Sequence, residues 1–218
     1  MSNKIISETE EIWGENYSTD SDVVEDKYDT FAGGGEYDET FTEWNYVGPE
    51  TAAAILKNYV PTGAKIMDAS CGSGLTGAAL KNLGFSNLEG MDISGNQLKL
   101  AEKTGAYSKL HKVDMQITPL PFDEGQFDAV NFIGALTYFE TNDILKNLCR
   151  IVKTGGVVAF SQRDDIMRDK NYEEKLAELE TLGLWKRTFS TEPMPYLPNH
   201  PEYGDKIKVQ YFIYEVTC

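Results

Sequence analysis

The chain has 218 residues, which is enough for one well-filled domain and short for two. Its composition is 41% hydrophobic and 25% charged, as in folded globular proteins, and this excludes a chain that is disordered throughout. Thirty-five acidic residues against twenty basic residues leave a formal charge of -15. That charge disfavours nucleic acid and anionic lipid surfaces as partners.

The negative charge is concentrated near the N-terminus. Residues 1–50 carry fourteen acidic side chains and two lysines, so their net charge is -12, and the rest of the chain carries only -3. We therefore interpret residues 1–27 as an acidic N-terminal segment and residues 28–218 as a single domain. Within this domain, residues 28–48 are expected to form a flap and residues 49–218 the core.

The cysteines and the apolar runs indicate the cellular compartment that we expect for this chain. Cys71, Cys149 and Cys218 are odd in number and widely spaced, which indicates neither a disulfide framework nor a zinc site with paired ligands. We find no export signal and no apolar run long enough to cross a bilayer. We expect a cytoplasmic protein without a metal, present as a monomer or a weak dimer.

The predicted elements begin with the flap. Six aromatic residues in residues 28–46 alternate with acids and with three consecutive glycines, which predicts a hinged segment. A helix is predicted from Pro49 to about Tyr59, because proline is favourable in a first helical turn. The pattern then alternates strands at 65–69, 88–92, 110–113, 127–133 and 157–161 with helices at 75–83, 97–104, 143–152 and 172–182. This alternation is typical of a parallel sheet with helices on both faces.

Two further features complete the predicted sheet. A turn is expected at Gly155-Gly156, directly before the strand at 157–161. Strands are predicted at 185–190 and 208–216, on either side of a proline-rich loop that contains no helical pattern. Strands joined without a helix favour an antiparallel hairpin, which we place at the edge of the sheet.

The most informative stretch joins the first predicted strand to the helix that follows it. Over residues 68–77 it reads Asp-Ala-Ser-Cys-Gly-Ser-Gly-Leu-Thr-Gly, so Gly72, Gly74 and Gly77 have the spacing G-x-G-x-x-G. This spacing alone is shared by nicotinamide and flavin enzymes. At the carboxyl edge of a parallel sheet, such a turn lets a ligand approach the backbone, and the next helix presents free N–H groups. We interpret it as a ligand-binding turn.

Three acidic residues follow the ends of three successive strands. Asp68 ends the first, where a buried carboxylate needs a cationic or hydrogen-bonding partner and would repel a pyrophosphate. Asp92 ends the second and can accept both hydroxyls of a ribose. Asp114 follows the third and can accept an adenine amino N–H. Together they predict an adenosyl ligand that carries an amino-acid tail.

At this point the chain resembles the class I S-adenosylmethionine-dependent methyltransferases over about residues 28–218. Residues 68–74 resemble the family's first motif, residues 122–130 its fourth-strand motif, and residues 150–156 the turn before its fifth strand. Ser70 stands where many members have glycine. The short body, the Tyr28-Asp29 pair and the tail around Tyr196 are most similar to small stand-alone members related to the Williams-Beuren-region methyltransferase.

The resemblance implies an α/β fold, a Rossmann-like doubly wound seven-stranded sheet in the order 3-2-1-4-5-7-6 with an antiparallel last strand. It implies S-adenosyl-L-methionine as cofactor, with residues 134–138 beside its methionine part and the acceptor. The implied reaction is an in-line displacement at the methyl carbon of a sulfonium, whose leaving group is a neutral thioether. Alignment and exclusion of water can then supply most of the rate enhancement. The implied cofactor-binding residues are Asp68, Ser70, Gly72, Gly74, Asp92, Ile93, Asp114, Met115 and Gly134.

For the acceptor we predict a small molecule, because the chain lacks a basic groove for nucleic acid and has little inserted sequence with which to hold a protein. The flap is expected to close over the cofactor, with the loop at residues 192–205 as a second cover. No catalytic side chain is identified, since Cys71 has no evident partner base and His111 lies in a short strand-like stretch. The candidate acceptor-pocket residues are Tyr28, Tyr37, Trp44, Tyr138 and His200.

Two alternatives stay open on the sequence. An NAD(P)-dependent oxidoreductase is permitted by the glycine spacing and Asp92, although Asp68, Asp114 and the lack of an evident Tyr-x-x-x-Lys pair argue against it. A catalytically silent protein that binds S-adenosylmethionine is permitted by the same cofactor motifs.

Overall fold

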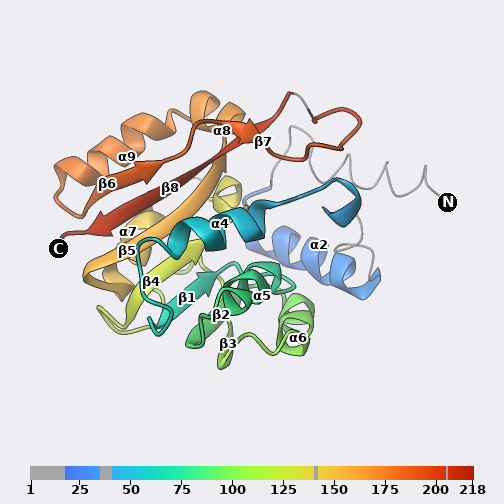
Figure 1. Ribbon diagram of the computed structural model, residues 1–218, viewed down its shortest axis with the longest axis horizontal. Helices are drawn as coiled ribbons and strands as arrows, with labels where there is room; N and C mark the ends of the chain where they lie inside the picture. Colours follow the sequence, from blue (N-terminus) through green and yellow to red (C-terminus); the bar gives the residue numbers. More distant parts are fainter. Residues whose placement is uncertain (1–17, 35–40, 140–141, 205) are drawn as a thin grey trace.

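A mixed β-sheet forms the centre of the computed structural model, which describes residues 18–34, 41–139, 142–204 and 206–218 (Figure 1). The strand order is β3-β2-β1-β4-β5-β8-β6, and the two-residue β7 pairs only with β8. The strands are β1 Ile66–Ala69, β2 Leu88–Asp92, β3 Lys109–Lys112, β4 Phe127–Phe132, β5 Val152–Arg163, β6 Trp185–Ser190, β7 Met194–Pro195 and β8 Lys208–Val216.

The pairing directions confirm the Rossmann-like sheet. β1 pairs in parallel with β2 and β4, β2 with β3, and β4 with β5. β8 is antiparallel to β5, β6 and β7. The predicted antiparallel pair is therefore present at one end of the sheet. β8 lies between β5 and β6, as the implied order 3-2-1-4-5-7-6 has it, and β6 and β3 end the strand order on its two sides.

Helices cover both faces of the sheet, because successive strand residues point to opposite sides. Ile66 packs with α4 and α5 in one hydrophobic cluster, whereas its neighbour Met67 packs with α7 and α9 in another. Both side chains are fully buried. The helices are α4 Gly48–Leu56, α5 Leu75–Asn82, α6 Gly95–Lys103, α7 Asp143–Ile151, α8 Asp164–Asp169 and α9 Tyr172–Thr181.

The first described helix, α2, shows that part of the predicted flap is regular structure. It spans Ser21–Gly34 and so crosses the predicted boundary between residues 27 and 28. The Asp20 carboxylate accepts the backbone N–H groups of Asp22 and Val23 at its start, as a helix cap does. The described residues 28–34 are therefore helical instead of hinged, whereas residues 35–40 of the predicted flap lie outside the described residues.

The predicted turn at Gly155-Gly156 lies inside a strand. β5 begins at Val152, which pairs with Phe127, and the register shifts before Ala129 pairs with Val157. A side chain at Gly156 would place its Cβ 2.5 Å from the carbonyl oxygen of Asp128, so the irregularity needs glycine there. The short elements α8, β7 and the 3-10 helix η1 (Leu136–Tyr138) had no pattern long enough to predict them.

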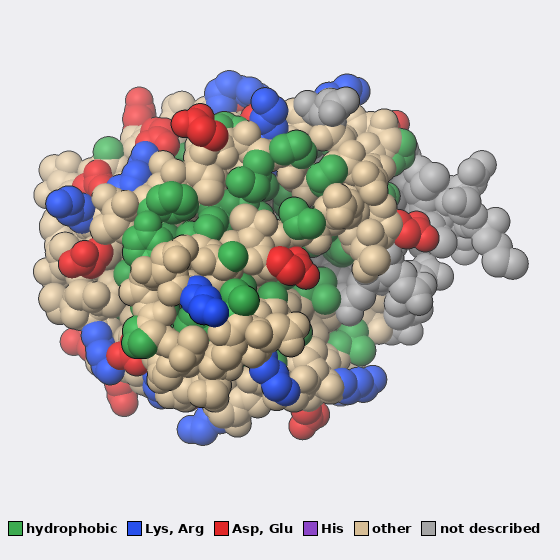
Figure 2. Space-filling model, viewed as in Figure 1, with side chains coloured by type: hydrophobic (Ala, Val, Ile, Leu, Met, Phe, Trp, Pro, Cys, Tyr) green, Lys and Arg blue, Asp and Glu red, His purple; other side chains and the backbone are tan. Residues whose placement is uncertain are grey.

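The surface has an apolar area on the face that carries α4. Figure 2 shows hydrophobic side chains across the middle of this face and charged side chains mostly towards its rim. The partly buried Ile55 and Phe189 pack against the hydrophobic cluster that contains residues of α4, and the ring centroid of Tyr59, a residue with 37% of its surface exposed, lies 6.0 Å from that of Phe189. Within the described residues, no helix is both long and apolar enough to cross a membrane.

Candidate functional site

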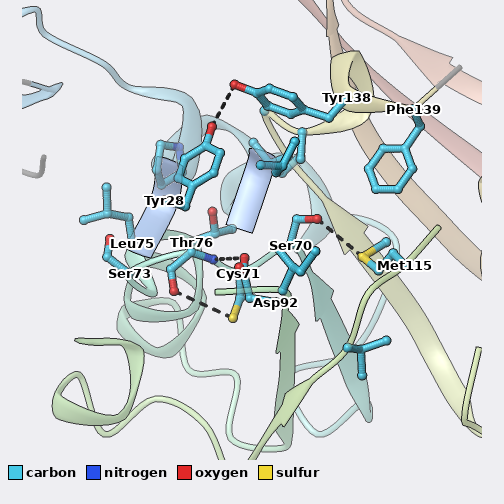
Figure 3. Close-up of a pocket in the computed structure, with 18 of the residues that line it drawn as sticks. Tyr28, Ser70, Cys71, Ser73, Leu75, Thr76, Asp92, Met115, Tyr138 and Phe139 are labelled. Atoms are coloured by element: carbon cyan, nitrogen blue, oxygen red, sulfur yellow. Dashed lines mark hydrogen bonds between the residues drawn. The ribbon is translucent and has the colours of Figure 1, made fainter. Parts of the chain in front are cut away.

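A cavity of about 990 Å³, counting the part open to solvent, lies at the carboxyl ends of the central parallel strands. The loops after β1, β2, β3 and β4 line it, and α2 closes one side (Figure 3). The cavity thus lies at the edge of the sheet where open α/β folds bind ligands.

Seven of the nine predicted cofactor-binding residues line this cavity. Asp68 and Gly74 do not. The seven come from four segments that are distant in sequence and meet only because the parallel strands end at one edge. They are Ser70, Gly72, Asp92, Ile93, Asp114, Met115 and Gly134.

Asp92, at the end of β2, is a buried carboxylate that faces the cavity. Its Oδ1 accepts the backbone N–H of Ser94 at 2.9 Å, and its Oδ2 accepts that of Gly72 at 2.9 Å. Burial raises the pKa of Asp92, and these backbone hydrogen bonds oppose the shift. Each carboxylate oxygen has a further lone pair with which it can accept a ligand hydroxyl.

The three glycines of the turn have different roles. Gly72 has φ +53°, lines the cavity, and has no atom within 4 Å of the place a Cβ would occupy. By contrast, a Cβ on Gly74 would lie 2.9 Å from the backbone of Ala101, and one on Gly77 would lie 2.2 Å from the hydroxyl of Tyr107. Gly72 therefore leaves room for a ligand, whereas Gly74 and Gly77 allow α5 to pack closely against its neighbours.

Asp68 has the hydrogen-bonding partners that a buried carboxylate needs, and they come from the protein. Its Oδ2 accepts the hydroxyl of Tyr107 at 2.7 Å, and its Oδ1 accepts Nδ2 of Asn131 at 2.9 Å. Burial raises the pKa of Asp68 to about 6, although these two hydrogen bonds oppose the rise. Tyr107 also accepts the backbone N–H of Gly77, so Asp68 supports the glycine turn through Tyr107.

Ser70 and Met115 meet across the floor of the cavity. Ser70 has φ +53°, a left-handed conformation that favours glycine, which agrees with the glycine found at this position in many similar proteins. Its hydroxyl donates to Sδ of Met115 at 3.4 Å (Figure 3). The loops after β1 and β3 are therefore joined by side chains that the sequence analysis assigned separately.

Two of the predicted acceptor residues form the opposite wall. The hydroxyl of Tyr28, on α2, donates to the hydroxyl of Tyr138, in η1, at 2.8 Å (Figure 3). Both line the cavity. Burial raises the pKa of Tyr138, so its phenol is uncharged near neutral pH.

The structure does not bring Trp44 and His200 into the cavity. Their rings lie 4.4 Å apart, and His200 stacks on Tyr203. Nδ1 of His200 accepts the backbone N–H groups of residues 202 and 203, and burial lowers its pKa. The Nδ1 atom therefore stabilises the loop in which His200 itself lies. Tyr37 lies outside the described residues.

Other aromatic residues line the cavity without having been assigned to it. Phe41 and Tyr46 come from the segment before α4, and Tyr196 comes from the loop after β7. Tyr46 packs against both of the others, with ring centroids 4.9 Å from Phe41 and 5.5 Å from Tyr196. Their aromatic character was a signal, but which of the aromatic residues turn inward depends on contacts between distant segments.

The charged lining residues are both acids. Asp92 and Asp114 line the cavity, and no lysine, arginine or histidine does so within the described residues. Lys27 and Arg163 approach Tyr138 from outside the lining, and Arg163 is held in a two-pronged ion pair with Asp165. The same described part of the chain contains no cluster of His, Cys, Asp and Glu that could hold a metal.

Comparison with known proteins identifies similar sequences. A family model described as "Methyltransferase domain" matches residues 67–160. Human methyltransferase-like protein 27 is 32% identical over 165 residues, which cover 73% of this chain and 66% of that protein. Demethylmenaquinone methyltransferase of Bacillus licheniformis is 35% identical over 103 residues, 45% of this chain and 44% of that protein. The chain thus spans about two thirds of the first relative and less than half of the second.

A solved structure shows the same fold. It is geranyl diphosphate C-methyltransferase from Streptomyces coelicolor, in complex with Mg2+, geranyl diphosphate and S-adenosyl-L-homocysteine. The TM-score is 0.61 at 14% sequence identity, and the match covers 76% of this chain and 78% of that one. At this identity the likeness concerns the fold.

Proposed function

This chain belongs to the class I S-adenosylmethionine-dependent methyltransferases, and from that premise we propose that it transfers a methyl group from S-adenosylmethionine to a small-molecule acceptor. The observation that carries the proposal is the cavity at the carboxyl edge of the sheet, where Asp92, Asp114 and the open Gly72 turn meet. Family membership sets aside the nicotinamide-dependent oxidoreductase that the glycine spacing alone permits.

The residues present fit the cofactor. Asp92 has carboxylate lone pairs directed to a cavity, which suits ribose hydroxyls, and Gly72 leaves the backbone accessible. We propose that Asp114 accepts the adenine amino group and that Ile93 and Met115 pack against the base. Ser70 and Gly134 would face the methionine part.

When bound, the cofactor supplies an electrophilic methyl group on a sulfonium with a neutral leaving group. The residues of this chain then have to bind the cofactor and the acceptor, align them with each other, and exclude water. Tyr28 and Tyr138 close the cavity with their joined hydroxyl groups, and Phe41 with Tyr46 adds apolar wall. We assign no side chain as a general base.

The lining also indicates the kind of acceptor. Aromatic side chains dominate the wall opposite the cofactor residues, and the charged groups among the described lining residues are carboxylates. The two carboxylates are assigned to the cofactor, so the aromatic wall, without a basic residue among the described lining residues, favours an uncharged or cationic aromatic or apolar molecule over a carboxylate or phosphate. The names of the Bacillus licheniformis relative and of the solved structure refer to unlike acceptors, a demethylmenaquinone and geranyl diphosphate, so they do not decide this choice.

The test is a screen of small metabolites by mass spectrometry, with S-adenosylmethionine present. The proposal predicts a compound that gains one methyl increment only when both protein and cofactor are added, and for which the Asp92→Ala variant is much slower. Methylation of a purified protein substrate, with no small molecule modified in the same panel, would contradict the small-molecule acceptor.

A further inference from the structure

We propose that Asp29 is a positioning residue, whose hydrogen bonds hold α2 against the loop after Asp92. Through these bonds, binding of the cofactor is coupled to closure of the acceptor side of the cavity by α2. The inference rests on the proposed function, since it assumes that Asp92 holds the ribose of the cofactor.

Asp29 makes its contacts at the first turn of α6. Its Oδ1 accepts the hydroxyl of Ser94 at 2.5 Å and the backbone N–H of Asn96 at 3.0 Å. Its carbonyl oxygen accepts Nδ2 of Asn96 at 3.3 Å. A carboxylate is stabilised at a helix N-terminus by free N–H groups and by the helix dipole. These contacts lower the pKa of Asp29, so it is charged at neutral pH.

Ser94 links Asp29 to the cofactor acid. Ser94 is fully buried, and its backbone N–H donates to Oδ1 of Asp92 at 2.9 Å. Its hydroxyl, besides donating to Asp29, accepts the backbone N–H of Gln97 as the cap of α6. A hydrogen-bonded path therefore runs from Asp29 through one buried residue to Asp92, and from Asp92 to Gly72.

The neighbouring turn of α2 lies over the other side of the cavity. Tyr28 precedes Asp29 and joins its hydroxyl to that of Tyr138, while its carbonyl oxygen accepts Nε2 of Gln97 at 3.4 Å. Val24, one turn earlier, is buried and lines the cavity. One short stretch of helix thus contacts both the loop of the cofactor acid and the aromatic wall.

Two other polar contacts of α2 and of the residues before it lie at the surface. Glu25 pairs with Lys112 at 2.6 Å with both side chains partly exposed, and the carbonyl oxygen of Thr19 accepts the side chain of Gln116. Exposed ion pairs contribute little to stability. We therefore expect the Asp29 contacts to hold α2 against the start of α6, and a ligand that orders the Asp92 loop should favour the docked α2. By linkage, docked α2 should in turn favour the ligand.

The experiment compares Asp29→Ala with Asp26→Ala, an exposed acid on the same helix, in the full chain. S-adenosylhomocysteine is the probe in calorimetry and in hydrogen exchange of residues 19–34. We expect Asp29→Ala to weaken binding about tenfold and to abolish the slowing of exchange that the probe causes in α2. Asp26→Ala should change neither measurement.

Asp29→Asn keeps a hydrogen-bond acceptor and loses the charge, so its affinity should lie between those of the wild type and Asp29→Ala. It also provides the comparison if Asp29→Ala does not fold. Wild-type affinity and wild-type α2 protection in Asp29→Ala, or in Asp29→Asn when that is the folded variant, would overturn the coupling. A wild-type protein that does not bind S-adenosylhomocysteine would overturn the proposed function itself.

Discussion

Two carboxylates at the ends of neighbouring strands have different surroundings and different expected roles. Asp92 faces the cavity and accepts two backbone N–H groups. Asp68 is held by the side chains of Tyr107 and Asn131 and does not line the cavity. We therefore expect the same residue type near two neighbouring strand ends to bind the ligand in one case, whereas in the other it supports the glycine turn through Tyr107.

Replacing Asp92 should weaken cofactor binding directly. Hydrogen bonds to a charged acceptor contribute about 1.5–3 kcal/mol each, so Asp92→Ala should raise the dissociation constant of S-adenosylhomocysteine at least about tenfold. Glu102→Ala, at an exposed acid on α6, is the control and should bind as the wild type does. An unchanged dissociation constant in folded Asp92→Ala would remove Asp92 from the cofactor site.

The pKa of Asp68 predicts a dependence of stability on pH. Its pKa rises from 3.8 to about 6 on folding, so the folded state binds this proton more tightly than the unfolded state. The resulting stabilisation is complete below pH 3.8 and is lost as the pH rises through about 6, by roughly 3 kcal/mol in the free energy of unfolding.

Denaturant unfolding between pH 4 and pH 7.5 measures this effect. The free energy of unfolding of the wild type should fall over that range relative to Asp68→Asn, which cannot titrate there. Parallel curves for the two proteins would show that Asp68 keeps an ordinary pKa in the fold.

At the scale of elements, the glycine turn is shaped by packing as well as by ligand access. Tyr107, which follows α6, fills the space beside Gly77 at the start of α5. Its hydroxyl accepts the backbone N–H of Gly77 and donates to Asp68. The third glycine of the motif is thus explained by a tyrosine thirty residues away in sequence.

Gly77→Ala should destabilise the protein by roughly 2–3 kcal/mol, because its Cβ would overlap the ring of Tyr107. Gly63→Ala is the matched control, since no atom lies within 4 Å of a Cβ there, and it should be neutral or slightly stabilising. The destabilisation by Gly77→Ala should largely disappear in a Tyr107→Ala background. Thermal or denaturant unfolding checks all three; an equal loss in both backgrounds would contradict the contact.

Local patterns predicted the elements that have strong local signals. The strands at β2 and β6 have the expected bounds, because short apolar or alternating runs are bounded there by turn residues. α2 was not predicted as a helix, since its exposed positions gave no clear period and its docking depends on Asp29 meeting α6. β5 begins early because a shift in register lets it pass through Gly155-Gly156.

For the candidate site, strand ends and glycines were visible in the sequence, whereas directions of side chains were not. Asp92, Asp114 and Gly72 line the cavity because parallel strands end at one edge. Trp44 and His200 face each other instead, and Tyr46 and Tyr196 take part in the lining. These choices are made by packing between segments more than a hundred residues apart, which local patterns do not contain.

At the scale of the whole molecule, the last strand, β8, joins the C-terminal strand β6 to the parallel part of the sheet. β8 pairs with both β5 and β6, so the C-terminal strands belong to the same sheet as the parallel strands whose loops line the cavity. Trp185 of β6 is buried, its ring centroid lies 4.1 Å from that of Tyr214, and its Nε1 donates to the carbonyl oxygen of Leu176. We therefore expect residues 49–218 to unfold as one unit.

Trp185→Ala should lower the free energy of unfolding by roughly 3–5 kcal/mol and lower the melting temperature of the whole domain. Leu182→Ala is the control, because 57% of the surface of Leu182 is exposed, and it should change the free energy of unfolding little. Circular dichroism and binding of S-adenosylhomocysteine should be lost in the same transition. Ligand binding that survives the loss of the C-terminal strands would contradict a single domain.

Calorimetry on the purified wild-type chain tests the central claim most directly, with S-adenosylmethionine, S-adenosylhomocysteine and NAD as separate ligands. The cavity residues predict saturable binding of both adenosyl ligands, weakened by Asp92→Ala, and no binding of NAD. Tight NAD binding with no heat from either adenosyl ligand would contradict the assignment.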